Sequence, residues 1–305
     1  MNALKSALKV SIITVNYNET ASTCALLDSI QRQAFREIEV IVVDNASRED
    51  PGSVLKARYP ALKYLRSEQN LGFAGGNNLA LPHATGEFLF FVNNDAELEP
   101  GCIETLLLFF ENHPRAGIVS PLICYFSTDK SEPKIIQYAG MTPISPFTGR
   151  NQVLGEREVD SGQFATPSIT AYAHGAAMMV PRMVLETVGP MWEGFFLYYE
   201  ELDWGARIQR AGFEVWVEPR AKVWHKESLT IQKMGTAKLF YLTRNRILFM
   251  RRNVSGGRFG VFLVFFALFS VPKQVFLCLI RGEFNQLKAF LRGIWAGFTV
   301  TVKTP

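Results

Sequence analysis

Short apolar runs recur through the first hundred residues and alternate with segments of helical spacing. The runs cover residues 10–15, 39–43, 62–66 and 87–92. Apolar runs of this length are typical of buried strands. Between them, residues 22–33 and 72–84 carry apolar side chains at helical spacing. The first third of the chain is therefore predicted to alternate strands with helices.

Three of these predicted strands end at polar side chains. The polar residues that follow them are Asn16 and Asn18, Asp44 and Asn45, and Asn93, Asn94 and Asp95. Strands separated by helices imply an α/β fold with a mostly parallel central sheet and flanking helices on both faces. In such sheets ligands bind outside the carboxyl ends of the strands. We therefore expect these polar residues to gather at one edge of the sheet.

The second half of the chain continues the fold after an irregular stretch. Residues 125–170 are rich in Pro, Gly, Ser and Thr, which predicts an insertion or hairpin lying over the site. Short strands are predicted at 174–181 and 213–217, with a helix over 200–212. We expect one domain over 1–250, in which 1–100 and 101–250 form two halves.

An apolar run over 259–280 follows this domain and is long enough to span a bilayer. Pro272, Lys273 and Gln274 interrupt it, and a charge near a bilayer centre costs about 2.5–3.5 kcal/mol. We therefore expect two shorter helices in the membrane interface, the second running on through 290–295. A single tilted span, a helical pair packed on the main domain and a dimer contact are the alternatives.

Basic residues precede the apolar run. They are Lys233, Lys238, Arg244, Arg246, Arg251, Arg252 and Arg258. Such flanking charges indicate contact with an anionic, cytoplasmic membrane surface, and a solvated helix face is the alternative. Residues 251–305 are thus predicted to form a membrane-associating tail. The chain is expected to be peripheral or monotopic at the cytoplasmic face of the inner (plasma) membrane.

Composition narrows the classes of protein that remain. The 305 residues are 48% hydrophobic and 20% charged, which allows a sizeable core. A net charge of +4 gives no argument for a nucleic-acid partner. The four cysteines are scattered without metal or disulfide spacing, which fits a reducing compartment. The first nine residues lack an apolar core of a signal peptide, so none is predicted.

The polar strand ends offer candidate ligands. Asp95 could hold Mg²⁺ or Mn²⁺, which prefer oxygen ligands, or could cap a helix that begins near Leu98. Asp44 could accept a hydrogen bond from a nucleotide base, or form an Asx turn with Ser47. The glycines of NLGFAGGNN (70–78) permit close backbone approach to phosphates. This motif does not follow the first strand as a dinucleotide fingerprint does, which argues against NAD.

A second group of candidates lies in the segment YYEELDW (198–204). Glu200 and Asp203 would share a helix face with Arg207, while Glu201 would project elsewhere. One acid could deprotonate a hydroxyl, and the alternative is an exposed helix start enriched in acids. His225 could ligate a metal, although a lone histidine is more often structural. His174, beside a glycine, could line an acceptor pocket.

Six blocks in this order resemble glycosyltransferase family 2, which has the GT-A fold, and its rhamnosyltransferase-like branch, which builds bacterial surface polysaccharides. The blocks are SIITVNYNE (11–19), VIVVDNAS (40–47), NLGFAGGNN (70–78), FLFFVNNDAEL (88–98), FFLYYEELDWGARIQRAGF (195–213) and VWH (223–225). Together they cover about residues 10 to 250. The resemblance makes 1–100 the nucleotide-sugar half and 101–250 the acceptor and catalytic half.

The resemblance implies a role for each matching residue. The residues expected to bind the nucleotide-sugar are Thr14, Val15, Asn16, Asn18, Asp44, Gly72, Asn77, Asn78 and Asn94. The expected metal ligands are Asp95 and His225. Glu201 matches the catalytic base best, ahead of Asp203 and then Glu200. Asn93 stands where many relatives carry an acid, which leaves Asp95 as the expected sole carboxylate ligand.

The function that the resemblance implies is an inverting, Mg²⁺- or Mn²⁺-dependent transfer of a sugar. The expected donor is dTDP-rhamnose, and a UDP-sugar such as UDP-galactose or UDP-N-acetylglucosamine is the alternative. The expected acceptor is lipid-linked or a polysaccharide, and a homo-oligomer is possible. A sugar nucleotidyltransferase is disfavoured because no glycine- and basic-rich loop follows the first strand. An inactive membrane-bound glycan-binding scaffold is the alternative from another class.

Overall fold

The computed structural model describes residues 9–129, 133–226 and 235–302, and Lys233 lies outside them. Its strands are β1 Val10–Asn16, β2 Ile38–Asn45, β3 Lys63–Ser67, β4 Phe88–Val92, β5 Ala96–Leu98, β6 Ala116–Tyr125, β7 Ile136–Tyr138, β8 Ser168–Ile169, β9 Ala177–Pro181 and β10 Glu214–His225. Its α-helices are α1 Thr20–Gln31, α2 Gly52–Arg58, α3 Gly72–Ala80, α4 Cys102–Asn112, α5 Arg182–Val188, α6 Glu200–Arg210, α8 Gly235–Asn253, α9 Gly257–Phe265, α10 Val271–Ile280 and α11 Phe284–Thr299. Two 3₁₀ turns, η1 Leu81–His83 and η2 Glu193–Phe195, and a π-helical turn, η3 Phe266–Ser270, complete them.

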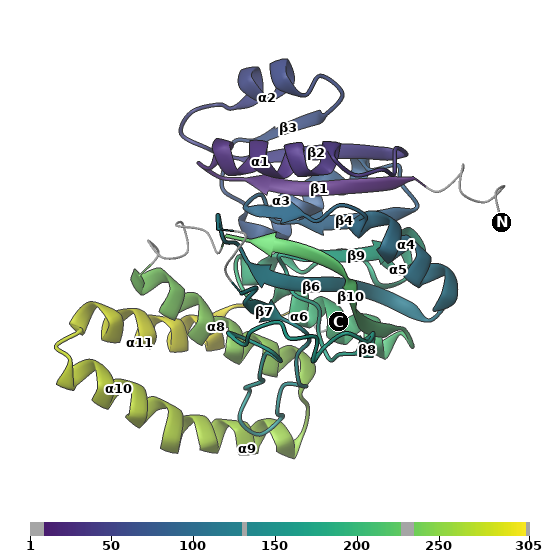
Figure 1. Cartoon of the computed structure of the whole chain (residues 1–305). Coiled ribbons are helices and arrows are strands. Elements are labelled where there is room, and N and C mark those ends of the chain that lie inside the picture. The colour runs from purple at the N-terminus through teal and green to yellow at the C-terminus, as the bar shows by residue number, and fades with distance from the viewer. Residues whose placement is uncertain (1–8, 130–132, 227–234, 303–305) are drawn as a thin grey trace.

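One mixed sheet forms the centre of the molecule, with strand order β3-β2-β1-β4-β9-β6-β10-β5 (Figure 1). β1 runs parallel to β2 and β4, so their carboxyl ends share one edge. β9 is antiparallel to both β4 and β6, and β5 is antiparallel to β10. The α/β fold with a mostly parallel sheet is confirmed, and β9 supplies an antiparallel strand at its middle.

Helices cover both faces of the sheet because β1 is apolar on both sides. Successive side chains of a strand point to opposite faces. Ile12 therefore packs with Leu26 of α1 and Leu106 of α4, in one buried cluster. Its neighbour Ile13 packs with Trp204 of α6 in the cluster of the other face. This double burial accounts for the unbroken apolar runs in the sequence.

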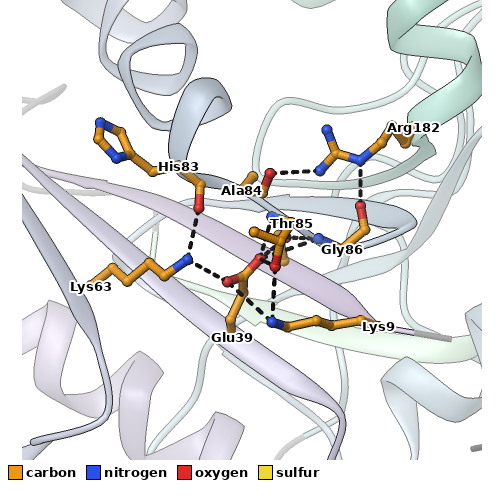
Figure 2. A network of polar contacts seen from close by, with 9 residues as sticks. Lys9, Glu39, Lys63, His83, Ala84, Thr85, Gly86 and Arg182 are labelled. Atoms are coloured by element: carbon orange, nitrogen blue, oxygen red, sulfur yellow. Dashed lines mark hydrogen bonds and ion pairs between the residues drawn. The ribbon is translucent and has the colours of Figure 1, made fainter. Parts of the chain in front are cut away.

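A polar network ties the strands together at their amino ends (Figure 2). The Glu39 carboxylate accepts hydrogen bonds from Lys63 Nζ at 2.7 Å, from Ser11 Oγ at 2.5 Å and from the backbone N–H of Thr85. Burial acts to raise the pKa of Glu39, but these hydrogen bonds outweigh it and hold the pKa well below its ordinary value. The network lies at the edge opposite the predicted ligand site, and we assign it to holding the strands in register.

The apolar tail differs from the expectation of two short helices divided near Pro272. Within the described residues, α9, η3 and α10 form one helix, Gly257–Ile280, with a mean hydropathy of 2.1 over its most apolar window. The π turn η3 ends at Ser270, and Pro272 is the second residue of the helix α10 that follows it. Proline lacks an N–H and its ring crowds the preceding turn, and a widened π turn accommodates both defects without a break. The helix ends instead near Gly282, which has a left-handed φ of 65°.

After Gly282 the chain reverses, and α11 packs along α8 on the side of the sheet away from β3 (Figure 1). Two glycines permit this close approach. A Cβ added to Gly297 would lie 2.9 Å from Ile247 Cβ, and one added to Gly293 would lie 2.8 Å from the Phe240 carbonyl oxygen. α8 is therefore held between α11 and the main domain.

The prediction that the basic residues before the tail meet a membrane is wrong for four of them. Arg252 pairs with Asp203, and Arg251 donates to the carbonyl oxygens of Gly297 and Val300. Arg244 and Arg246 also donate to backbone carbonyls of the main domain. Burying an arginine requires such partners, because an unpaired buried charge is costly. Of the predicted set that the structure describes, Lys238 and Arg258 stay exposed.

Candidate functional site

Asp95 and His225 meet at the carboxyl edge of the sheet. Asn93 follows β4, and its N–H donates to the Ala176 carbonyl, which turns the chain. β5 then pairs antiparallel with β10, so that Ala96 lies opposite His225. This register places Asp95 Oδ1 3.1 Å from His225 Nε2, with both side chains buried. The expected helix beginning near Leu98 was wrong, because β5 occupies that position and α4 begins at Cys102.

A glutamine of the insertion orients the histidine. The Nδ1 atom of His225 lies 2.8 Å from Oε1 of Gln137, the middle residue of β7. An amide oxygen only accepts, so Nδ1 donates to Gln137, and Nε2 is the ring nitrogen that faces Asp95. A metal-ligating histidine is commonly held in this way through its second nitrogen. Asn93 Nδ2 lies 3.4 Å from the same Nε2 atom.

This pair fits one face of a divalent-cation site. A carboxylate oxygen and an imidazole lone pair that point together are donors suited to Mn²⁺ and, less well, to Mg²⁺. Within the described ranges, no group of three or more His, Cys, Asp and Glu side chains gathers. A cation held by Asp95 and His225 would therefore take its remaining ligands from water or from a bound diphosphate. The ring of His174 lies near that of His225, with their centroids 6.1 Å apart. Burial lowers the pKa of His174 to about 3, so its imidazole is neutral at pH 7.

A chain of hydrogen bonds links the polar ends of β1, β2 and β4. Asn16 Nδ2 donates to Asp44 Oδ1 at 2.9 Å, and Asn16 Oδ1 accepts from Thr23 Oγ1 at 2.8 Å. Thr23 in turn accepts from Asn94 Nδ2 at 3.2 Å. The sequence predicted that Asn16, Asp44 and Asn94 lie at one edge, and the structure joins them through Thr23 of α1.

Asp44 is fully buried beneath this edge. Its carboxylate accepts from the Ser47 N–H at 3.2 Å, which is the turn that the sequence allowed, and pairs with Arg66 at 3.1 Å. The Arg66 side chain remains about one third exposed. Ser47 Oγ also accepts from the Asn18 N–H at 2.8 Å, which holds Asn18 at a left-handed φ of 56°. These contacts build a rigid rim at the ends of β1 and β2.

The remaining candidates of the nucleotide-sugar half lie on β1 and α3. Thr14 is fully buried, and among the described residues its Oγ1 has no hydrogen-bond partner. Val15 lies against Gly76, where an added Cβ would come within 2.9 Å of its Cγ1. Asn77 donates to the Phe73 carbonyl at 2.9 Å and Asn78 to the Met191 carbonyl at 2.8 Å. The Asn78 amide thus ties α3 to the segment around Met191, while the Asn77 bond stays within α3.

Gly72 joins the two halves of the chain. It has a φ of 71°, and a Cβ there would lie 2.0 Å from the Phe196 carbonyl oxygen. Only glycine fits so close an approach. The next residue, Phe73, donates its N–H to the same oxygen at 2.7 Å. The start of α3 is therefore docked on the loop that leads into α6.

The acids of α6 occupy three different surroundings. Glu201 is half-buried beside Gly175, where an added Cβ would lie 3.8 Å from its carboxyl carbon. Ala176, the residue after Gly175, accepts a hydrogen bond from the backbone N–H of Asn93. Glu201 therefore lies near the turn that carries Asp95. Burial raises the pKa of Glu201 to about 7. Burial, and then the nearby Glu201 charge, raise the pKa of Glu200 well above its ordinary value.

Asp203 is held on every side. Arg252 donates to it at 2.9 and 3.1 Å, Asn253 at 2.9 Å and Arg207 at 3.3 Å. Its side chain is fully buried. The contacts from Arg252 and Asn253 tie α6 to α8, and the contact from Arg207 stays within α6.

Sequence reasoning missed several residues that build this edge. Gln137 lies in the irregular insertion, where no motif marks it. Thr23 reads as an ordinary helix residue. Asn245 stands between two arginines, and its neighbours suggested a membrane contact instead. Each acts through a partner far along the chain, so no local pattern could reveal it.

Comparison with known proteins identifies the family of the chain and proteins that are similar to it. The sequence model of the family described as Glycosyl transferase family 2 matches residues 11–189. The chain is similar to N-acetylglucosaminyl-diphospho-decaprenol L-rhamnosyltransferase of Mycobacterium tuberculosis, 23% identical over 262 residues, which are 80% of this chain and 85% of the relative.

Solved structures share the fold. A Pyrobaculum calidifontis mannosyltransferase in complex with GDP-Man and Mn²⁺ matches with a TM-score of 0.58 and 17% identity, over 96% of this chain and 76% of that one. Staphylococcus aureus TarS (residues 1–349) in complex with UDP-GlcNAc matches with a TM-score of 0.57 and 17% identity, over 94% and 82%.

Proposed function

Because the chain belongs to glycosyl transferase family 2, we propose that it is an inverting, metal-dependent transferase whose site is the edge that holds Asp95, His225 and Glu201. One observation carries the proposal. The structure brings a buried carboxylate–imidazole pair and a carboxyl group with a pKa of about 7 to one corner of the sheet. Charge neutralisation and proton removal are the two tasks that sugar transfer from a diphosphate requires.

The proton transfer is assigned to Glu201. The acceptor oxygen forms a bond to the anomeric carbon of the donor, while the bond from that carbon to the diphosphate oxygen breaks on the opposite side. The diphosphate leaves with the electron pair, and the acceptor hydroxyl proton passes to the Glu201 carboxylate. Asp95 and His225 would hold a divalent cation, and a cation bound there would supply positive charge that favours the leaving diphosphate.

The other candidates then fall into supporting roles. Asp44 fixes Arg66 and Asn16 on the nucleotide side of the site, beside Val15 and Asn18. The fully buried Thr14 is assigned a supporting place beneath them. Gly72 sets the approach of α3 to the catalytic loop. Asp203 joins α6 to α8, and it is assigned no part in proton transfer because Arg252, Asn253 and Arg207 bind its carboxylate.

The donor and acceptor are proposed from the relatives. The mycobacterial relative is named for transfer of L-rhamnose to a diphospho-decaprenol, and this relative supports a rhamnosyl donor and a lipid-linked acceptor in cell-surface glycan synthesis. The TarS structure contains UDP-GlcNAc, so a UDP-sugar is the second candidate.

A nucleotide panel tests the proposal. Melting temperature is measured with dTDP, UDP, GDP and ADP, each with and without Mn²⁺. A ligand at about 100 times its Kd stabilises the native state by about 2.7 kcal/mol, which raises Tm by about 4 °C in a chain of this size. We expect dTDP with Mn²⁺ to give the largest shift. A larger shift with UDP would move the donor to the UDP-sugars, and no shift with any nucleotide would overturn the proposed function.

We propose a membrane surface as the partner of the tail. The helix Gly257–Ile280 exposes a series of large apolar side chains, which are Val261, Val264, Leu268, Phe269, Phe276, Leu279 and Ile280. Trp295 of α11 is also 70% exposed. Exposed cations, Lys273, Arg281, Lys288 and Arg292, accompany them. An apolar face of this size with basic neighbours suits an anionic bilayer.

Sedimentation of the whole chain with vesicles tests this proposal. We expect binding to vesicles of phosphatidylglycerol and phosphatidylcholine, and weaker binding to phosphatidylcholine alone. Changing both Leu268 and Phe276 to Glu is expected to weaken binding by about 10-fold or more, because two large apolar side chains no longer leave water. Leu108→Glu, at an exposed site on α4, is the control and should bind normally. Equal binding by both variants would contradict the assignment.

A further inference from the structure

The loop that leads into α6 has a strained backbone. Phe196, Tyr198 and Tyr199 have φ angles of 67°, 69° and 78°, in the left-handed region that favours glycine. Such a conformation is strained and persists only where the surroundings hold it. Glu200 and Glu201 follow directly, so the shape of this loop decides where α6 begins.

One side chain of α8 holds the loop. Asn245 is fully buried, and its Nδ2 atom lies 3.0, 2.6 and 2.8 Å from the carbonyl oxygens of Phe195, Leu197 and Tyr198. Its own carbonyl oxygen accepts from Arg244 Nε at 2.8 Å, which fixes the amide with its N–H bonds toward the loop. The two N–H bonds of this amide are shared among three buried carbonyl oxygens, which would otherwise lack these hydrogen bonds.

Two further contacts complete the clamp. Arg244 donates to the Gly194 carbonyl at 3.0 Å and to the Phe195 carbonyl. From the opposite side, the Phe73 N–H donates to the Phe196 carbonyl. Since α8 is packed against α11 at Gly293 and Gly297, the clamp is carried by a fixed element.

We propose that Asn245 is a positioning residue for the transfer reaction, which sets the place and the desolvation of Glu201 through the loop 195–199. This inference rests on the proposed function of Glu201 as the base. Asn245 itself is not placed in contact with donor or acceptor. Without its amide, the strained residues relax toward ordinary φ values, and the start of α6 moves with them.

The expected result has two parts. A base displaced by about 1 Å costs about 10²-fold in rate, so Asn245→Ala is expected to lower kcat by that factor with the donor KM within about 2-fold of the wild type. A looser loop also admits water to Glu201. Burial is what raises the pKa of this carboxyl to about 7, so the acid limb of the rate profile should move toward lower pH by about one unit.

Other titratable and charged groups surround Glu201. Glu200 neighbours it on α6 and Tyr199 on the loop, and Arg244 of α8 acts on Glu200. Glu200 and Tyr199 have raised pKa values, because burial disfavours their charged forms. The acid limb is assigned to Glu201 on the expectation that it is absent from Glu201→Gln, in which Glu200 and Tyr199 are unchanged.

Asn253→Ala is the matched control. Asn253 ends the same helix and donates to Asp203 and to the Phe249 carbonyl, away from the loop. This variant should lose stability but keep kcat for each folded molecule and keep the acid limb. Asn245→Ser retains one donor and replaces the alanine variant if that protein does not fold; it should show the same two changes at smaller size.

An Asn245 variant with the wild-type limb and kcat would overturn the inference. A loss of active molecules alone, with the limb in place, would also overturn it, because that outcome indicates a purely structural role. The proposed function fails differently. If Glu201→Gln transferred sugar as fast as the wild type, Glu201 would not be the base, whatever the Asn245 variants do.

Discussion

Glu201→Gln is expected to lower kcat by about 10²–10⁴-fold, which is the usual contribution of a positioned general base. The amide has nearly the size of the carboxyl group but cannot accept the acceptor hydroxyl proton. Donor binding should persist, because Glu201 is assigned to proton transfer and the diphosphate is assigned to Asp95 and His225. The measurement is steady-state transfer together with the thermal shift caused by the nucleotide.

The pH dependence of the wild type follows from the same residue. Burial raises the pKa of Glu201 to about 7, so the carboxyl group is protonated and inactive as a base below that pH. kcat is therefore expected to rise with pH through about 7 and then level off. In Glu201→Gln the residual rate should lack this limb.

Two neighbouring acids serve as controls. Glu200 is buried and is assigned no contact with the acceptor hydroxyl, so the effect of Glu200→Gln on kcat should be small. Asp203→Asn leaves Arg252 buried without its charge partner, so it should lower stability and spare the rate of the folded molecules. Full activity in Glu201→Gln with a large loss in either control would move the base to that residue.

The second large effect is expected from Asp95→Asn. Removing the carboxylate leaves His225 as the remaining protein ligand of the proposed cation site. Loss of a group that stabilises developing charge costs about 10²–10³-fold in rate. The concentration of Mn²⁺ needed for half-maximal activity should rise as well, since an amide oxygen is a weaker ligand than a carboxylate.

Titration of Mn²⁺ against activity and direct Mn²⁺ binding in the presence of nucleotide provide the measurements. Asp28→Asn is the matched control, because Asp28 pairs with Arg58 on the outer side of α1. This variant should retain the Mn²⁺ dependence of the wild type. A wild-type enzyme whose activity does not change after chelation of divalent ions would contradict the cation site, and Asp95→Asn would then need another explanation.

Much of the fold was predictable because its signals are local. The apolar runs of β1, β2 and β4 exceed what a surface segment would carry, and polar residues follow all three of them. Parallel strands put those ends at one edge, so Asn16, Asp44 and Asp95 could be placed together from the sequence. Helical spacing likewise predicted α6 and thus the separation of Glu201 from the face of Asp203.

Other features depend on contacts between distant segments. The pairing of β5 with β10 brings Asp95 to His225, and a helix had been expected where β5 lies. Gln137 contacts His225, which lies 88 residues later in the sequence. Asn245 donates to the carbonyl of Leu197, which lies 48 residues earlier. Arginines that look like a membrane-facing cluster in the sequence instead donate to backbone carbonyls of the chain or pair with Asp203.

The sequence by itself thus determined the alternation of strands and helices, the polar edge and the family, because apolar periodicity and ordered motifs are written within short stretches of chain. The tertiary structure decided which of three neighbouring acids lies beside Gly175 and which is buried in an ion pair, and it showed that Pro272 does not break the apolar helix. The physical reason is that burial, pKa and charge pairing are set by whatever packs against a residue. For Glu201, Asp203 and His225, those partners lie on other elements.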